Sequence, residues 1–213
     1  MKYRKYILFI SIIILILIYA FNQMNNQNIP ESKSNTQDLE EAIIDIQERN
    51  DIEKIKIDFS KYTRPSDDKI KENLTNLQYE VTQKEGTEKP FDNEYYDNYE
   101  LGLYVDIVTG EPLFFSTDKY KSDTGWPSFT KPINLDVITF HEDNKLLTTR
   151  IEVKSKVGKS HLGHVFNDGP VAEGGLRYCL NSSALKFIPY DKMKISGYKE
   201  LIAPLNKLNS MNW

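Results

Sequence analysis

Cysteine is nearly absent from this chain, which has a single one, Cys179, among 213 residues. A single thiol excludes an internal disulfide, a CxxC redox pair and a four-cysteine zinc site. The HExxH pattern of zinc proteases is absent as well. If Cys179 is chemically active, another molecule therefore has to complete the reaction that it starts.

A basic stripe is the second missing feature. The chain has 27 Lys and Arg against 31 Asp and Glu, a net charge of −4. Removing the three positive charges of Lys2, Arg4 and Lys5 from that total leaves −7 for the remainder. A mildly acidic body without a basic stripe argues against nucleic acid as the partner.

Charge is also missing from the apolar run Tyr6 to Phe21, and the next charged residue is Glu31. As a helix this run would be about 24 Å long, shorter than a ~30 Å hydrocarbon core but longer than most signal-peptide cores. Residues 1–21 are therefore either a transmembrane anchor or a cleaved signal segment. Because the positive charges precede the run, both alternatives predict an extracytoplasmic body, membrane-anchored or secreted.

Residues 22–65 are expected to form a polar linker that includes a short helix and an extended arm. Asn, Gln and Ser dominate up to Asp38, where a capping-box spacing to Glu41 predicts the start of the helix. Further on, Ile55, Ile57 and Phe59 alternate with charged residues, which indicates a strand or an extended arm packed on the main domain. The main domain is predicted over 66–200, followed by a C-terminal tail over 201–213.

The main domain is predicted to be mainly β, of the α+β class. Thr75 and Gln78 fit a capping box that opens a helix with Leu77 and Val81 on its apolar side. Loops with Gly and Pro then separate short β-type runs, which predict mostly antiparallel strands after one or two helices. These runs are Leu103–Val108, Leu113–Phe115, Asp136–His141, Leu146–Val153, Leu176–Leu180 and Leu185–Pro189.

The residues with chemical potential are concentrated in three segments: GWPSF at 125–129, SHLGHVF at 160–166 and LRYCLNS at 176–182. Each has an ordinary structural explanation. A lone cysteine is often a small buried hydrophobe, and a tryptophan beside a proline is often part of the core. Two histidines three residues apart are either satisfied polar groups or half of a metal site.

Placing the third segment on a strand favours a chemical role. Strand side chains alternate, so Arg177, Cys179 and Asn181 share one face and Tyr178 and Leu180 the other. Since the second pair suits the core, the polar trio is expected to face a cleft. A positive charge from Arg177 or a protonated histidine can lower a thiol pKa from ~8.5 to ~6.5, which makes thiolate the major form at neutral pH.

In this order and spacing, the three segments resemble the signature of the methionine-R-sulfoxide reductases, the MsrB family. The resemblance extends from about Leu74 to about Tyr198 and leaves residues 1–65 outside it. It implies a fold of two antiparallel sheets and a thiol enzyme that reduces the R epimer of methionine sulfoxide, usually within proteins. Residues 66–200 are then an MsrB-like catalytic domain.

The resemblance also implies catalytic roles. Cys179 matches the nucleophile that attacks the sulfoxide sulfur and is left as a sulfenic acid. His161 and His164 match the paired histidines that donate and orient the proton needed by the sulfoxide oxygen. Asn181 matches the asparagine that assists them.

The substrate-binding residues expected from the resemblance are Trp126, Phe166 and Arg177. Trp126 matches the tryptophan whose ring packs on the substrate methyl group. An aromatic face suits a methyl on a sulfur that becomes cationic as its oxygen is protonated.

Two departures from the family pattern matter. Many members have a resolving cysteine in GCGWPSF, where this chain has Thr124, so an external thiol reductant, thioredoxin-like or small, has to reduce Cys179. Zinc-containing members have two CxxC pairs, whose positions carry other residues here. These positions are Asp106, Thr109, Ser155 and Gly158. We therefore expect no metal and no bound cofactor, with packing in place of the zinc cross-link.

Three functional hypotheses follow. The first is a membrane-tethered extracytoplasmic reductase that repairs oxidised proteins. The second is a cysteine hydrolase that uses Cys179, a histidine and Asn181. The third is a non-catalytic module that binds methionine sulfoxide. His141, followed by Glu142 and Asp143 in an expected turn, is predicted to be a surface residue outside all three.

Overall fold

The structure is a computed structural model that describes Glu41, Ile44 and residues 55–145 and 149–211. Residues 55–211 belong to one compact unit, 35–213. The predicted membrane or signal segment over 1–21 lies outside the described residues, as does most of the helix predicted after Asp38. In the described part of the chain, no helix combines the length and the apolar character that crossing a membrane requires.

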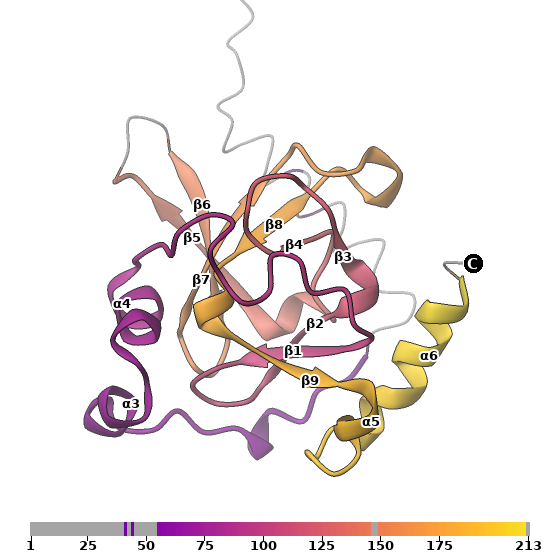
Figure 1. Ribbon diagram of the computed structural model, residues 1–213, viewed down its shortest axis with the longest axis horizontal. Helices are drawn as coiled ribbons and strands as arrows, with labels where there is room; N and C mark the ends of the chain where they lie inside the picture. Colours follow the sequence, from indigo (N-terminus) through magenta and orange to yellow (C-terminus); the bar gives the residue numbers. More distant parts are fainter. Residues whose placement is uncertain (1–40, 42–43, 45–54, 146–148, 212–213) are drawn as a thin grey trace, which may run out of the picture. The chain divides into compact units, whose positions relative to one another are not determined.

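Two antiparallel sheets form the centre of this unit (Figure 1). The small sheet has the strand order β2-β1-β9 and the large sheet the order β3-β4-β8-β7-β6-β5. Every strand pairing in both sheets is antiparallel. The expectation of a mainly β domain with two antiparallel sheets is therefore confirmed.

Six of the strands correspond to the six predicted runs. They are β1 Gly102–Asp106, β2 Pro112–Phe115, β5 Ile138–Asp143, β6 Arg150–Ser155, β8 Arg177–Leu180 and β9 Leu185–Pro189. Three further strands were not predicted: β3 Lys119–Tyr120, β4 Ser128–Phe129 and β7 His161–Phe166. The first two are too short to show a period, and a glycine interrupts the third.

Helices lie on both sides of the sheets, with α3 and α4 on one side and α5 and α6 on the other (Figure 1). Their bounds are α3 Asp67–Asn73, α4 Asn76–Lys84, α5 Tyr190–Met193 and α6 Ile202–Met211. The predicted capping box opens α4, where Thr75 Oγ1 accepts from the Gln78 N–H and Gln78 Oε1 accepts from the Thr75 N–H. Val81 is buried as expected, whereas Leu77 is 52% exposed, so the predicted apolar side is only half correct.

Successive side chains of β1 point to opposite faces of the small sheet and so belong to two separate hydrophobic clusters. Tyr104 belongs to a cluster with Phe114, Phe129 and Tyr178, which lies toward the large sheet. Leu103 and Val105 belong to a second cluster, which also includes side chains of α5 and α6. The small sheet therefore has apolar packing on both faces, which explains why all five residues of β1 are buried.

The chain on either side of the expected domain takes part in this packing. Ile57 contacts both clusters, and the side-chain amide of Asn134 donates to the Ile55 carbonyl at 2.6 Å. The arm is thus packed and irregular rather than a strand, with a short 3-10 turn over Phe59–Lys61. Residues 202–211, which we expected in a tail, form α6, and Leu205 of that helix is fully buried.

A polar link joins the β1–β2 turn to the β6–β7 turn, at the positions that the resemblance aligns with the cysteines of zinc-containing members. Glu111, which is fully buried, accepts hydrogen bonds from the N–H groups of Val157 and Gly158. Asp106 Oδ1 accepts from the N–H and hydroxyl of Thr109. Where we expected packing in place of the zinc cross-link, hydrogen bonds to the buried Glu111 carboxyl group join the two turns.

These residues do not fit a tetrahedral zinc ion. Thr109 and Gly158 provide no thiolate, and a Cβ at Gly158 would lie 2.7 Å from Asp106 Oδ1. Within residues 55–145 and 149–211, no three His, Cys, Asp or Glu side chains are grouped as a metal site.

Candidate active site

A small pocket over β7 and β8 collects most of the side chains predicted to be functional. Its volume is about 110 Å³. It is lined by Thr87, Trp126, Arg150, Gly163, His164, Phe166, Cys179, Leu180 and Asn181. Residues from separate parts of the sequence thus meet around the only thiol of the chain.

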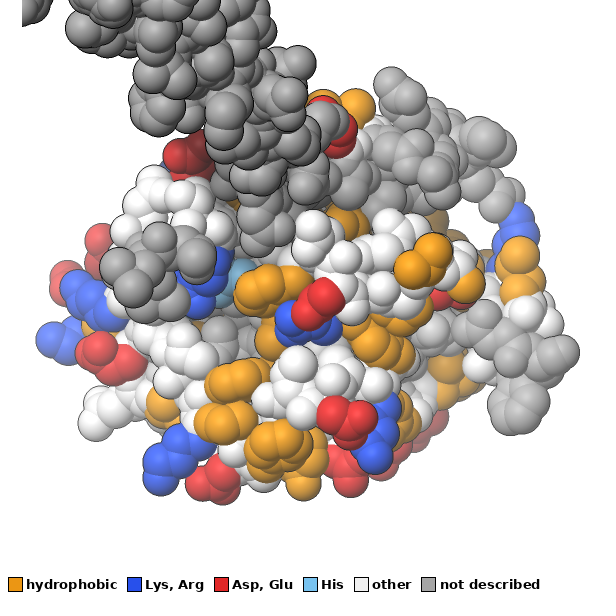
Figure 2. Space-filling model, turned by 90° about the horizontal axis from the view of Figure 1, so that it is seen from above, with side chains coloured by type: hydrophobic (Ala, Val, Ile, Leu, Met, Phe, Trp, Pro, Cys, Tyr) orange, Lys and Arg blue, Asp and Glu red, His pale blue; other side chains and the backbone are white. Residues whose placement is uncertain are grey.

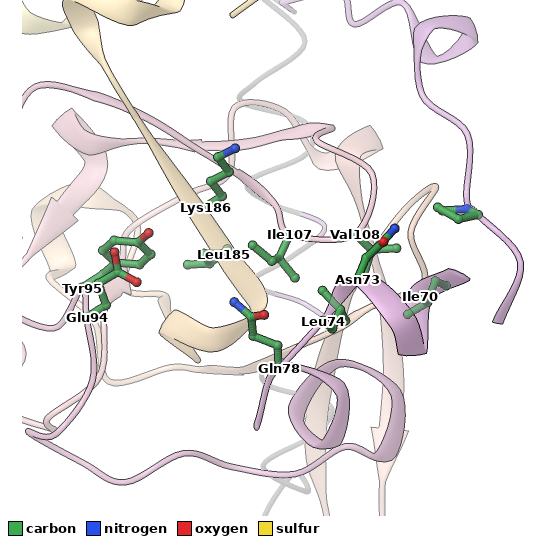
Figure 3. Close-up of a pocket in the computed structure, with 11 residues that line it drawn as sticks. Ile70, Asn73, Leu74, Gln78, Glu94, Tyr95, Ile107, Val108, Leu185 and Lys186 are labelled. Atoms are coloured by element: carbon green, nitrogen blue, oxygen red, sulfur yellow. The ribbon is translucent and has the colours of Figure 1, made fainter. Parts of the chain in front are cut away.

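A larger cavity, of about 410 Å³, lies between α3, the start of α4 and β9 (Figure 3). Aliphatic and amide side chains line most of it, with Glu94, Tyr95 and Lys186 at one end. It contains no thiol and no imidazole. The chemistry is therefore assigned to the smaller pocket.

Cys179 lies in the middle of the large sheet, where β8 pairs with both β4 and β7. In the strand pairing, Cys179 is directly opposite His164 of β7 on one side and Ser128 of β4 on the other. The neighbouring Tyr178 and Leu180 are buried in the core, as the strand period predicts. Cys179 is partly exposed in the pocket, and its Sγ lies 3.8 Å from the Thr124 hydroxyl.

Burial raises the pKa of the Cys179 thiol above its ordinary value, against the opposing effects of Arg177, Thr124 and Ser128. Arg177 therefore acts in the predicted direction but does not determine the outcome. The lowering that Arg177 could provide is therefore outweighed by burial, and the thiol form predominates at neutral pH.

His161 and His164 come together because of a bulge in β7. The pairing with β6 shifts by one residue, so that Gly163 is opposite Val153 but His161 is opposite Lys154. In a regular strand, residues three apart point to opposite faces. The additional residue instead brings the two imidazole rings to a centroid separation of 5.4 Å.

Each histidine is hydrogen-bonded to a buried carboxylate from another strand of the large sheet. His164 Nε2 lies 2.7 Å from Asp143 Oδ2, at the end of β5. His161 Nδ1 lies 2.5 Å from Glu152 Oε1 on β6. A carboxylate partner fixes the orientation of an imidazole and stabilises its protonated form.

Each of these two carboxylates also forms an ion pair with a basic side chain. The Arg150 guanidinium lies 2.6 Å from Asp143, and the Lys154 ammonium lies 3.2 Å from Glu152. The pKa of Asp143 is well below its usual range: burial acts to raise it, but hydrogen bonds from His164, the Lys145 N–H and Arg150 together prevail. Asp143 is therefore ionised at neutral pH.

The pKa of His164 moves in the opposite direction from a typical carboxylate-paired histidine. Burial lowers it below 6.5, and the hydrogen bond to Asp143 only partly opposes this. His164 is therefore neutral at neutral pH, next to a protonated thiol. Among the two histidines, His164 lines the pocket, whereas His161 is 2% exposed beneath it.

Gly163 allows the close approach of β7 and β8 that places His164 beside Cys179. A Cβ at this position would lie 2.1 Å from the carbonyl oxygen of Cys179. Only glycine leaves room for that carbonyl.

Asn181 and Trp126 are both fixed by the backbone of Glu88. The Asn181 side chain donates to the Leu162 carbonyl at 3.1 Å and accepts from the Glu88 N–H at 3.1 Å. The Trp126 indole N–H donates to the Glu88 carbonyl at 3.1 Å. Because Asn181 is 3% exposed and the ring is partly exposed, the amide lies at the floor of the pocket and the indole in its wall.

The profile of the SelR domain matches residues 74–189 of this chain. The chain belongs to the SelR (MsrB) family. A similar curated protein is the peptide methionine sulfoxide reductase MsrA/MsrB of Vibrio cholerae serotype O1, 63% identical over 142 residues. The match covers 67% of this chain and 37% of that relative, so this chain corresponds to less than half of the longer protein.

Two residues assigned to substrate binding occupy different places in the SelR domain. Phe166 lines the pocket, whereas Arg177 is not one of the lining residues and has its guanidinium 4.4 Å from the centre of the Phe166 ring. Two hydrogen bonds of 2.7 and 2.8 Å join Arg177 to Asp168. Arg177 therefore packs on the Phe166 ring, and its charge also acts on the Cys179 thiol.

Sequence reasoning missed several residues of this SelR site. Asp143 was expected in a surface turn next to His141; His141 is indeed exposed, but Asp143 ends β5 and bonds to His164. Glu152 and Glu88 were not singled out. Their partners lie on other strands or beyond a loop, and no local pattern marks such contacts.

Proposed function

We propose that this SelR domain reduces the R epimer of methionine sulfoxide at Cys179. The observation that carries the proposal is the pocket that brings the Cys179 thiol, the His164 imidazole and the Trp126 ring together. A water molecule occupies about 30 Å³ in the liquid, so a pocket of about 110 Å³ holds only a few heavy atoms. That volume suits the methyl sulfoxide end of a side chain.

The reaction transfers the sulfoxide oxygen to the thiol. Cys179 sulfur attacks the sulfoxide sulfur and forms an S–S bond, and the S–O bond breaks as its oxygen is protonated. The hydroxide released then bonds to the Cys179 sulfur, the S–S bond breaks, and methionine leaves Cys179 as a sulfenic acid. The thiol is oxidised by two electrons and the sulfoxide is reduced by two. The thiol proton passes to His164, which becomes imidazolium beside Asp143 and delivers the proton to the departing oxygen.

Two external thiols complete the cycle. They reduce the Cys179 sulfenic acid, form a disulfide with each other and release water. Thr124 near the sulfur has no thiol with which to form an internal disulfide. A thioredoxin-like protein or a small thiol therefore supplies the electrons, and oxidised proteins are the substrates.

The test is dithiothreitol-driven reduction of the two resolved epimers of a methionine sulfoxide peptide. We expect turnover of the R epimer that requires dithiothreitol and is lost in Cys179→Ser. The cysteine hydrolase predicts an acyl-enzyme and turnover without a reductant, and the binding module predicts affinity without turnover. Undiminished reduction by Cys179→Ser would exclude Cys179 as the nucleophile.

The proposed location is outside the cytoplasmic membrane, by an anchor or after signal cleavage. The uncharged run over 6–21, preceded by Lys2, Arg4 and Lys5, supports it. Protease added to intact wall-free cells that produce the full chain tests it. Digestion of the SelR domain is expected if the domain is anchored outside, and its appearance in the medium if it is secreted; protection inside the cells would contradict both.

A further inference from the structure

Glu88 lies in the loop between α4 and β1 and is 4% exposed. Through its backbone, this one residue contacts both the indole N–H of Trp126 and the side-chain oxygen of Asn181, each at 3.1 Å. The substrate-binding ring and the catalytic amide therefore share a single point of attachment.

The Glu88 carboxylate fixes the turn that directly follows the nucleophile strand. It accepts from the N–H of Ser182, from the N–H of Ser183 at 2.8 Å and from the Ser183 hydroxyl at 2.6 Å. These donors belong to the 3-10 turn Ser182–Ala184, for which Asn181 is the N-terminal capping residue. Three donors converge on two oxygens, so a carboxylate satisfies the turn where an amide would present N–H groups to other donors.

The same loop is fastened to the segment that carries Trp126. The Asn93 side chain donates to the Gly125 carbonyl at 2.8 Å and accepts from the Ser182 hydroxyl at 2.6 Å. The Phe91 N–H donates to the same carbonyl at 2.9 Å. Residues 88–93 thus bridge the chain before Trp126 and the turn after Cys179.

We propose that Glu88 is a positioning residue for sulfoxide reduction, a role that rests on the function proposed above. Its carboxylate holds the turn after Cys179, and its backbone sets the Trp126 ring and the Asn181 amide relative to the thiol. Loss of the carboxylate displaces the two groups together, because both bonds are made by the residue whose side chain is anchored.

The first measurement compares Glu88→Gln with Glu94→Gln, an exposed glutamate of the same loop. We expect kcat/KM for the R-sulfoxide peptide to fall about 10- to 100-fold in Glu88→Gln, the effect of losing hydrogen bonds to a buried carboxylate. The control should stay within about twofold of wild type. Glu88→Asp keeps the charge on a shorter side chain and should recover part of the loss.

The second measurement separates positioning from a general loss of stability. The chain has two tryptophans, so Trp213→Phe leaves Trp126 as the only indole fluorophore. In that background, Glu88→Gln should shift the emission maximum of the folded protein to longer wavelength, and Glu94→Gln should not. The losses in kcat/KM of Glu88→Gln and Trp126→Phe should also be less than multiplicative when combined.

The outcomes distinguish the two proposals. If wild type does not reduce the R epimer, the proposed function fails, while the Trp126 emission still tests the contact. If wild type is active, a Glu88→Gln variant with more than half of its kcat/KM, or with fully multiplicative losses, overturns the positioning role. If Glu88→Gln does not fold, by circular dichroism, Glu88→Asp carries the same kinetic and fluorescence tests.

Discussion

At the scale of single residues, the proposed chemistry depends on the transfer of a proton from Cys179 to His164. Burial raises the pKa of the thiol and lowers that of the imidazole, so both groups are neutral before substrate enters. The ion pair of thiolate and imidazolium has the same net charge, and Asp143 beside His164 stabilises it. In the proposed reaction, the proton is therefore supplied from within the site.

Alanine substitutions distinguish the two histidines. His164→Ala should lower kcat by about 10²- to 10⁴-fold, the usual contribution of a general acid, because its ring lines the pocket. His161→Ala should lower kcat less and stability more, since it leaves the buried Glu152 with Lys154 as its remaining partner. Steady-state kinetics with exposed His141→Ala as the control checks this. Equal losses in kcat for the two variants would contradict it.

Thr124→Cys should convert the external recycling into an internal one. The Thr124 hydroxyl lies 3.8 Å from the sulfur, and a disulfide needs about 2 Å, which a side-chain rotation can provide. After one equivalent of R-sulfoxide, mass spectrometry should show the variant with two hydrogens fewer and no free thiol. A sulfenic acid that persists at Cys179 in this variant would show that position 124 is too distant to resolve it.

Which residues were predictable depends on whether their partners are local. The strand period alone put Cys179 and Asn181 on the face opposite Tyr178, and the structure agrees. Asp143 reaches His164 only because β5, β6 and β7 are adjacent, so its role required the sheet order.

At the scale of elements, the bulge in β7 shapes the site. The bulge aligns the two histidines, which a regular strand would separate. The capping box of α4 was predictable because the two side chains that form it lie within four consecutive residues. The strands β3 and β4 were not, since two residues show no period.

The buried link between the turns should make stability depend on pH. Burial raises the pKa of Glu111 from 4.5 to about 7. A carboxyl whose folded pKa is raised contributes stability below its unfolded pKa and loses it as pH rises through the folded pKa. Because the shift spans pH 4.5 to about 7, the loss amounts to roughly 2–3 kcal/mol between pH 5 and 8.

Urea unfolding of wild type and Glu111→Gln at pH 5 and pH 8 measures this effect. The amide does not ionise, so the difference in unfolding free energy between the two proteins should favour wild type more at pH 5 than at pH 8. Subtracting the unfolding free energy of Glu111→Gln from that of wild type at each pH cancels the pH dependence of the other titratable groups. The same difference at both pH values would contradict the burial of an ionising carboxyl at this link.

At the scale of the whole molecule, the described chain surrounds the small sheet with two apolar clusters and places the site on the large sheet. The second cluster depends on α5 and α6, and sequence analysis assigned no element to the C-terminal residues. Leu205 is buried there because the face of the small sheet turned away from the large sheet needs a cover. The need to cover this face follows from the arrangement of the two sheets, which the sequence pattern of residues 202–211 does not show.

The surface shown in Figure 2 has acidic and basic side chains interspersed around a central group of hydrophobic ones. An extended basic area, which binding to nucleic acid would require, is not seen in this view.

A single turnover without reductant tests the central claim most directly, because the whole chain has one thiol. Wild-type protein is mixed with excess R-sulfoxide peptide and then with dimedone, and methionine and protein masses are measured. We expect one methionine formed per protein molecule, one dimedone adduct at Cys179, and neither product with the S epimer. Methionine formed while the Cys179 thiol stays free, or no methionine at all, would contradict it.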